Sequence, residues 1–483
     1  MRTTLRKGLV ALLLAAGSAS AMAQAGPPEP PSVEPPSHVD DAGRAAPEAV
    51  PVATPAVAPG AEPVTPIAAS APVAQPGAAA VIDGADTAWV LMCTVLVLLM
   101  TMPGILLFYS GMMRGKNGLS IAGHTIIAAA ATTMAWIVAG YSFAFGAGTP
   151  WVGDASRLFA AGVVGQGAGA HPVAPTIPEA AFFMFELAFA VITVALVLGA
   201  TVERMRLAAT AVFAPLWTLV VYAPVAHWIW HPNGWLASMG HMDFAGGTVV
   251  HIASGMSGMA AAWSIGPRRG FGREAMLPHN LLVTVIGGGL LWAGWFGFNA
   301  GSALGANARS ADALLATQAA ACAGALFWAG CEYLRRRQCS VLGTLSGAIA
   351  GLIAVTPASG YVDAVGAVAL GVAAGTICFF SVVHFKSVSG IDDSLDVFAL
   401  HGVGGFVGTL LTPVVATTAV APVPGNLFVN TIGALSVSCY AVLATLLLLK
   451  LMSFVMRLRV DEEAESVGLD MSQHGEMLSP ESA

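Results

Sequence analysis

Long apolar stretches constrain this chain more than any other feature of its sequence. Each stretch is close to the ~20 residues that an α-helix needs to cross the hydrocarbon core of a bilayer. They begin near Asp86, Ser120, Ile177, Ala208, Gly246, His279, Ala311, Val341, Tyr361, Asp396 and Leu427. Only 10% of the 483 residues are charged and 56% are hydrophobic, whereas a soluble domain has roughly 25% charged residues. The sequence therefore predicts an all-α polytopic membrane protein with eleven transmembrane helices.

The residues before the first span have a composition of their own. A basic start (MRTTLRK) precedes a short apolar run, and small residues at cleavage-site spacing follow it, as in a secretory signal peptide. We expect residues 1–23 to be a signal peptide. Residues 24–83 are rich in Pro, Ala and Val and are expected to form a disordered extracytoplasmic leader. Residues 84–458 would form the membrane domain and residues 459–483 a C-terminal tail.

The basic residues orient the spans. A cleaved signal peptide places the mature N-terminus outside, so eleven spans place the C-terminus in the cytoplasm. Two basic residues, Arg157 and Arg309, then lie in outer loops. Fourteen lie at cytoplasmic ends, namely Arg114, Lys116, Arg204, Arg206, Arg268, Arg269, Arg273, Arg335, Arg336, Arg337, Lys386, Lys450, Arg457 and Arg459. This distribution follows the positive-inside bias and supports the predicted topology.

Two histidines occupy matching places in spans of opposite orientation. DFAGGTVVHI (243–252) opens the fifth span and DVFALHGVGG (396–405) opens the tenth. In helices, His251 would lie ~12 Å inward of Asp243 and His401 ~7.5 Å from Asp396, which places both rings near the midplane. Ionisable groups inside a membrane are costly and mark substrate or proton pathways, so we expect a functional pair. The pattern favours two inverted five-helix repeats plus a final helix, with the site at their interface.

Three acidic residues need separate interpretations. Asp243 could cap its helix and also stabilise a cation at the outer mouth; on this view Asp243→Asn would keep the cap and remove only the charge. For Asp396, helix capping and a role in the site are equally open. Glu186 lies about ten residues into the third span, where an unpaired charge is expensive, and it stays unexplained.

Other classes of function are excluded or unsupported. No basic block is long enough to indicate a nucleic-acid partner. The six cysteines lie in apolar segments or at their ends, without metal-ligand spacing or a disulfide framework. We expect no enzymatic activity, no cofactor and no metal site.

Six segments together resemble a known family. They are TMPGILLFYSGMMRGKN (101–117), GATVERMR (199–206), DFAGGTVVHI (243–252), LWAGWFGFNAGSA (291–303), SGAIAGLIAVTPASGYV (346–362) and DVFALHGVGG (396–405). The chain resembles the ammonium transporter (Amt/Mep/Rh) family, bacterial Amt-type, over about residues 84–476. This resemblance implies a homotrimer of eleven-helix protomers in a bacterial inner membrane, each protomer with a narrow pore for ammonium or methylammonium.

The resemblance also implies roles for individual residues. Trp230, Phe189 and Ser302 would form an outer recruitment site, with Phe185 lining the same mouth. Phe298 would stack on Phe189 as a gate. His251 and His401 match the family's paired pore histidines, which would pass neutral ammonia while a proton crosses separately. Glu186 departs from the amide expected beside Phe185.

The tail segment VGLDMSQHGEM (467–477) resembles the family's cytoplasmic tail, which couples protomers and helps a PII-type signal protein block the pores. Asp470, His474 and Glu476 would be its polar contacts. A plain solvated acidic end is the alternative for this segment. For the whole chain, the alternatives to ammonium transport are an ammonium sensor acting through the tail and a passive ammonia gas channel.

Overall fold

The computed structural model describes residues 81–165, 169–421 and 425–478. The expected signal peptide and the expected leader up to residue 80 lie outside the described residues. The described part of the chain is helical and contains no β-strand. These findings confirm the predicted all-α fold class.

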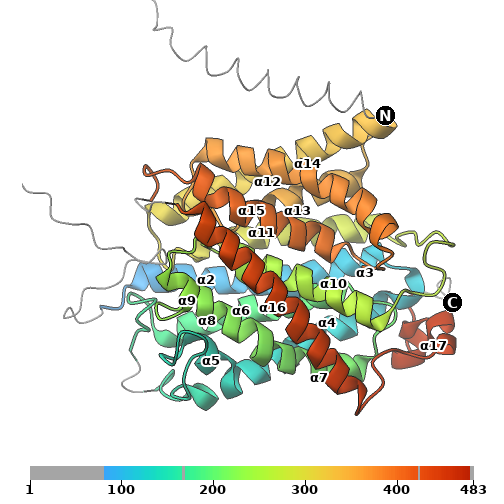
Figure 1. The fold of residues 1–483 in the computed structure, drawn as a ribbon, viewed down its shortest axis with the longest axis horizontal. Coiled ribbons are helices and arrows are strands. Elements are labelled where there is room, and N and C mark those ends of the chain that lie inside the picture. Colours follow the sequence, from blue (N-terminus) through green and yellow to red (C-terminus); the bar gives the residue numbers. More distant parts are fainter. Residues whose placement is uncertain (1–80, 166–168, 422–424, 479–483) are drawn as a thin grey trace, which may run out of the picture. The chain divides into compact units, whose positions relative to one another are not determined.

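The α-helices run in chain order through both halves of the sequence (Figure 1). In the first half they are α2 (Gly84–Leu99), α3 (Leu106–Met112), α4 (Gly118–Ala135), α5 (Tyr141–Phe145), α6 (Glu179–Gly199), α7 (Leu207–Trp217), α8 (Ala223–Trp230), α9 (Trp235–Ser238) and α10 (Ala253–Ile265). In the second half they are α11 (Leu281–Gly301), α12 (Ala308–Arg336), α13 (Val341–Val355), α14 (Ala364–Ser389), α15 (Val403–Val415), α16 (Leu427–Ser453) and α17 (Glu462–Val467).

Shorter helical turns link or open several of these helices. The π-helical turns are η2 (Met100–Ile105), η4 (Trp136–Gly140), η6 (Thr218–Tyr222), η7 (Gly247–Ile252), η8 (Phe398–Gly402) and η9 (Asp470–His474). The 3₁₀ turns are η3 (Gly115–Asn117) and η5 (Leu158–Ala160). Because π-turns often occur at functional sites, the pair η7 and η8, which carries the two histidines, is notable.

Nine helical runs in the described chain are long and apolar enough to cross a membrane. They are Gly84–Met112, Gly115–Phe145, Glu179–Gly199, Leu207–Ser238, Leu281–Gly301, Ala308–Arg336, Ala364–Ser389, Phe398–Val415 and Leu427–Ser453. The two other expected spans are helical over 247–265 and over Val341–Val355; the second is an apolar helix that is shorter than the nine runs. Both are largely buried among other helices, so they need less apolar surface than a helix that faces lipid.

The two halves share a repeated unit. In the first half, η7 carries His251 and continues into the 13-residue helix α10; in the second, η8 carries His401 and continues into the 13-residue helix α15. The units cross where α10 meets η8, because a Cβ added to Gly255 would lie 2.1 Å from the Gly402 nitrogen. Glycine therefore permits the close approach that brings the two histidine-bearing turns together.

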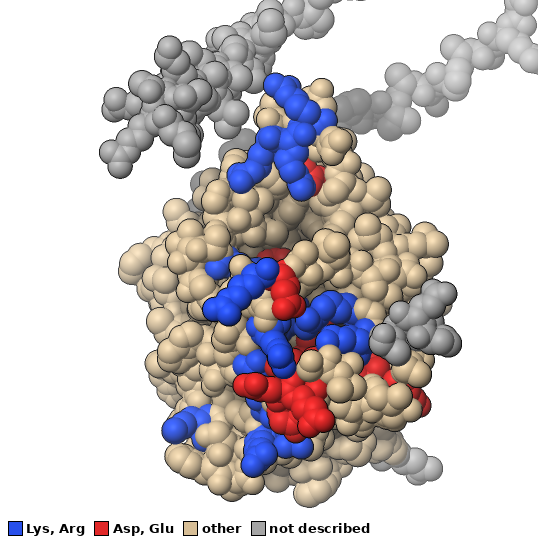
Figure 2. All heavy atoms as spheres, turned by 90° about the vertical axis from the view of Figure 1, so that its right-hand side faces the viewer, with Lys and Arg blue, Asp and Glu red and all other residues tan. Residues whose placement is uncertain are grey.

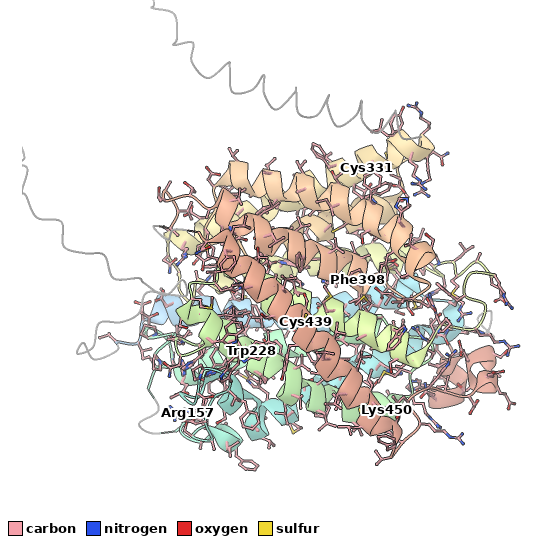
Figure 3. The ribbon with its side chains drawn as sticks, in the orientation of Figure 1. Arg157, Trp228, Cys331, Phe398, Cys439 and Lys450 are labelled. Carbon is pink, nitrogen blue, oxygen red and sulfur yellow. The ribbon has the colours of Figure 1, made fainter. Side chains whose placement is uncertain are left out.

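Most basic residues gather at one end of the spans, which we call the basic end and define by Arg114, Arg204 and Arg268. Figure 2 looks onto this end and shows Lys, Arg, Asp and Glu side chains clustered across it. The short helix α17 lies at the same end (Figure 1). In Figure 3, Trp228 and Arg157 lie toward the opposite end and Lys450 toward the basic end.

Candidate functional site

Aromatic side chains from three helices meet near the opposite end of the spans. Phe189 of α6 stacks on Phe298 of α11, with ring centroids 4.1 Å apart and planes 17° apart. Phe185 lies one helical turn from Phe189, with a centroid distance of 4.9 Å. Each of these three rings is at most 1% exposed. The predicted stacking of Phe189 on Phe298 is therefore present in the structure.

Trp230 and Ser302 extend this group away from the basic end. The Trp230 indole meets Phe189 edge-on at 5.8 Å and is 8% exposed. The Ser302 hydroxyl donates its hydrogen to the Phe298 carbonyl at 2.9 Å, so its oxygen lone pairs are left to accept a hydrogen bond. We call Trp230, Phe185, Phe189 and Ser302 the aromatic site. It combines electron-rich ring faces with one hydrogen-bond acceptor.

Asp243 caps the helix that carries His251. One carboxylate oxygen accepts the backbone N–H groups of Gly246 and Gly247, and the other accepts those of Thr248 and Val249, over 2.6–3.0 Å. The Asp243 carbonyl also accepts the indole N–H of Trp230 at 3.0 Å. The predicted cap is therefore present, and it is tied to the aromatic site through Trp230. All four lone-pair positions of the carboxylate are occupied.

The predicted histidine pair lies on the basic-end side of the gate. The Nδ1 atoms of His251 and His401 are 3.2 Å apart, so one ring donates to the other and each fixes the tautomer of its partner. His251 stacks on Trp295, with centroids 5.4 Å apart, and lies 6.1 Å from Phe298 by the same measure. His251 Nε2 is buried without a hydrogen-bond partner, which leaves this nitrogen for a passing molecule.

A narrow cavity surrounds the two histidines. Its walls are mostly aliphatic and aromatic, and the histidines share it with the hydroxyl-bearing Tyr109. Phe298 of the gate also lines it. A small neutral molecule that donates and accepts hydrogen bonds could therefore pass the histidines, whereas a hydrated ion would lose its water without replacement.

Asp396 is not the cap of its helix. The side chain that accepts the Phe398 backbone N–H, at 2.7 Å, belongs to Asp393, and Asp396 instead pairs with Lys386 at 3.0 Å. Asp396 has a left-handed φ of 56°, which turns its carboxylate toward α14. The sequence showed an acidic residue before the helix, but only the backbone turn decides which acid reaches the free N–H groups.

The tail docks on the basic end through some of the predicted residues. Asp470 accepts the backbone N–H groups of Leu119 and Ser120 at 3.0 and 2.6 Å, at the start of α4. His474 packs on Gly123, where an added Cβ would lie 2.7 Å from the imidazole. Glu476 is exposed, and the contact found for it is the bond from its backbone N–H to the Asp470 carbonyl. Burial raises the pKa of Asp470, although the α4 N–H groups oppose that rise.

Glu465 is a tail contact that the sequence did not predict. Glu465 is 2% exposed; it accepts the Arg269 backbone N–H and pairs with Arg459 at 2.8 Å. Lys116 donates to the carbonyls of Glu465 and Ser466. A lone glutamate in an acidic stretch gives no sequence signal for burial, because the partners come from distant loops.

A buried ion network joins the same loops to the membrane domain. Glu203 pairs with Arg114 at 3.0 Å and with Arg268 at 2.9 Å, and Arg268 also pairs with Asp392 at 2.8 Å. Burial raises the pKa of Glu203, but Arg268 and Arg114 outweigh this, and its pKa lies below the ordinary value. Through Glu203, the GATVERMR segment therefore links the loops that carry Arg114, Arg268 and Asp392 at the basic end.

Comparisons with known proteins agree with this arrangement. Residues 88–478 match the model of the Ammonium Transporter Family. The chain is 40% identical to an ammonium transporter of Bacillus subtilis over 400 residues, or 81% of this chain and 97% of the relative. It is likewise 40% identical to the ammonium transporter Amt1 of Archaeoglobus fulgidus over 82% of this chain and 99% of that one.

Solved structures give the same result. The crystal structure of Candida albicans Mep2 superposes with a TM-score of 0.75 at 36% identity, covering 83% of this chain and 92% of Mep2. A sensor Amt protein superposes with a TM-score of 0.74 at 28% identity, covering 81% and 98%. With its stacked Phe189–Phe298 pair, its paired histidines and a family match over most of its length, this multi-pass membrane protein belongs to the ammonium transporter family.

Proposed function

We propose that the chain recruits ammonium at the aromatic site and conducts it as ammonia past His251 and His401, with associated proton transfer. The observation that carries this proposal is the stacked Phe189–Phe298 pair directly above a narrow cavity that contains the two bonded histidines. A gate and a hydrogen-bonding pair in an otherwise apolar passage suit a small substrate that changes its charge on entry.

Capture of the cation follows from the chemistry of the aromatic site. Trp230, Phe185 and Phe189 offer ring faces, and cation–π attraction is worth about 1–2 kcal/mol once the cation is partly desolvated. Ser302 offers an acceptor for an N–H bond. Potassium is similar in charge and size but cannot donate that bond, so the site favours ammonium and methylammonium.

Passage requires the loss of a proton. A bare cation would lose its hydration inside the cavity at high cost, so ammonium gives up its proton near the gate and ammonia continues. At the histidines ammonia meets one ring that donates and one nitrogen that accepts, and the proton crosses separately over the histidine pair. Reprotonation at the basic end returns ammonium.

The surroundings of the site follow from the same proposal. The basic end faces the cytoplasm and the aromatic site faces outward, in agreement with the positive-inside bias, and the chain lies in a bacterial inner membrane. The protomers form a homotrimer, and the docked tail at the basic end is the surface on which a PII-type signal protein would act.

The direct test is electrical. Ammonium pulses on proteoliposomes that contain the purified protein are expected to produce an inward positive current, and methylammonium a smaller one. His251→Leu or His401→Leu should suppress the current or admit potassium, because the pore loses its relay or its discrimination. An acidic residue at one of the two positions should be tolerated better, since it can exchange a proton.

The alternatives give other results. Ammonia uptake without any current would contradict the proton-coupled mechanism and indicate a gas channel. Ammonium binding without uptake would indicate a sensor, a possibility that the similarity to a sensor Amt protein keeps open.

A further inference from the structure

Glu186 is a buried acid with no role in the mechanism above. It lies on α6 between Phe185 and Phe189 of the aromatic site. The residue is 8% exposed, and its Oε2 atom is buried without a hydrogen-bond partner. No basic side chain of the described residues forms an ion pair with it. An unpaired carboxylate in these surroundings is costly, so the environment favours either the neutral acid or a cation nearby.

The other two acids of this region are already satisfied. Both oxygens of Asp243 accept two backbone N–H groups each. Glu179, two turns earlier on α6, accepts from the Tyr141 hydroxyl and from two nitrogens of Arg157 at 2.8–3.2 Å. Among these three carboxyls, Glu186 is the one with an oxygen free to bind a proton.

The side chain lies at the depth of the aromatic site. An α-helix rises about 1.5 Å per residue, so the Glu186 backbone is about 1.5 Å along the helix axis from Phe185 and about 4.5 Å from Phe189. The ring centroids of Phe185 and Phe189 are 4.9 Å apart, and the Glu186 backbone lies between these two residues along the helix axis. A charge on Glu186 therefore acts on the aromatic site through low-dielectric surroundings, where Coulomb interactions extend far.

A second unpartnered polar group lies near Glu186. The Tyr222 hydroxyl on η6 is fully buried and has no hydrogen-bond partner, and it is within electrostatic range of both Glu186 and Asp243. Tyr141 on α5 is also within range of Glu186. The remaining titratable groups on elements packed against α6 are Asp86 and Cys93 on α2, His124 on α4 and His251 on η7. No described basic residue is available to hold Glu186 in its charged form.

We propose that Glu186 is a proton-binding site whose protonation competes with cation capture at the aromatic site. With the carboxylate form, the outer mouth carries two negative charges, from Asp243 and Glu186, and holds ammonium well. With the acid form only the Asp243 carboxylate remains to hold the cation, and capture is weaker. Because such coupling is reciprocal, ammonium binding must in turn release the proton from Glu186. This inference rests on the proposed function and adds a dependence of ammonium affinity on outer pH.

The test compares apparent ammonium affinity as a function of outer pH in three variants. The concentration of the ammonium ion is set independently of pH, from about pH 5 to about pH 9, which brackets the range in which buried carboxyls titrate. In the unmodified protein the apparent KM should rise at least about fivefold toward acid pH, the lower end of typical coupling between sites. We call this rise in apparent KM the pH step. Glu186→Gln should remove the pH step, and Glu186→Asp should keep it.

Glu179→Gln is the matched control, since it removes a buried acid from the same helix. It should lower thermal stability, because Arg157 loses its partner, and keep the pH step. Glu186→Gln should be at least as thermally stable as the unmodified protein, because the costly acid is gone. An unchanged pH dependence of KM in a folded Glu186→Gln trimer would overturn the proposal.

A binding measurement separates this inference from the proposed function. Ammonium binding to the protein in detergent is measured by isothermal titration calorimetry over the same pH range. If binding shows the Glu186-dependent step while uptake is absent, the transport mechanism fails and the proton site stands. If uptake is present and neither assay shows the step, the proton site fails and the transport mechanism stands.

Discussion

At the scale of single residues, the side chains of the aromatic site differ from their neighbours in the residues that they contact. Trp230 both packs nearly perpendicular to Phe189 and donates its N–H to the Asp243 carbonyl. The nearby Trp228 packs against Trp151 and Trp235 instead. Two tryptophans of one helix thus contact different residues, because the helix directs their side chains to different sides.

We predict that Trp230→Leu weakens competition by methylammonium about 5- to 30-fold, as expected from the loss of about 1–2 kcal/mol of cation–π attraction. The measurement is inhibition of ammonium current by methylammonium in proteoliposomes. Trp228→Leu is the control and should leave selectivity unchanged. Unaltered selectivity in a folded Trp230→Leu protein would remove the recruitment role of this residue.

Asp243→Asn should not act as a pure charge substitution. The structure shows two N–H groups on each carboxylate oxygen, so an asparagine amide would place its NH₂ against two donors. We expect a loss of about 2–4 kcal/mol in the free energy of unfolding, from unpaired buried N–H groups, seen as a lower midpoint of thermal unfolding. Asp363→Asn is the control, because Asp363 accepts one N–H group, from Gly366, and asparagine caps equally well. Equal midpoints for the two variants would contradict this account.

At the scale of elements, the site depends on how closely η8 approaches α10. Gly255 and Gly402 meet backbone to backbone, and on the same interface a Cβ added to Gly405 would lie 2.9 Å from the His251 Cβ. The distance between the histidines is therefore set by helix crossing rather than by their own side chains. Small residues permit the crossing, and the π-turns orient the rings.

Gly255→Ala is predicted to abolish transport, since its Cβ would lie 2.1 Å from the Gly402 nitrogen and the turns would have to separate. The expected result is loss of ammonium current, with a lower thermal midpoint in whatever protein assembles. Gly289→Ala on α11 is the control, because a Cβ there meets nothing within 4 Å. Normal current in Gly255→Ala would show that the crossing tolerates displacement.

At the scale of the whole molecule, the basic end joins the membrane domain to the tail. Glu203, Arg268 and Asp392 form the buried part of this junction, and Glu465 and Asp470 fix the tail to it. The loops of this end therefore link the tail to the spans that carry His251 and His401.

The ion network predicts a pH dependence of stability. The pKa of Glu203 is lowered in the folded protein by Arg268 and Arg114, against the effect of burial. The stabilisation that Glu203 gives to the folded protein is therefore complete above the pKa of a glutamate in the unfolded chain, about 4. It is lost as the pH falls from there through the lower pKa of the folded state. The thermal midpoint should drop on acidification below about pH 4, and less steeply in Glu203→Gln. Identical slopes would exclude Glu203 as the titrating group.

Deleting residues 460–483 should leave membrane insertion intact, since the described spans end before them. Transport should change, and inhibition by a PII-type protein should be lost, because Glu465 and Asp470 no longer hold the tail at the basic end. The measurement is ammonium current with and without the purified signal protein. A narrower variant, Asp470→Ala, should give the same loss with the tail still present, whereas regulation like that of the full chain would contradict a regulatory tail.

Much of the fold and the site followed from local features of the sequence. The apolar stretches gave the helical membrane fold, and long ordered motifs such as DFAGGTVVHI gave the family. Phe298, His251 and His401 lie within those motifs, whereas Phe189 came only from the resemblance to the family; in the structure Phe189 stacks on Phe298 and the two histidines meet. These inferences succeed because span length, residue type and motif spacing are properties of short segments.

Other features depend on contacts between segments far apart in the chain. The sequence alone marked Asp396 as a possible cap and left Glu465 unnoticed, whereas the fold gives the cap to Asp393 and buries Glu465. It also could not place Glu186, whose solvation depends on which helices surround α6. Sequence by itself determined which segments enter the membrane and which residue types they carry. Tertiary structure decided which polar atoms find partners and which stay unpaired, because hydrogen bonds and burial depend on the meeting of distant elements.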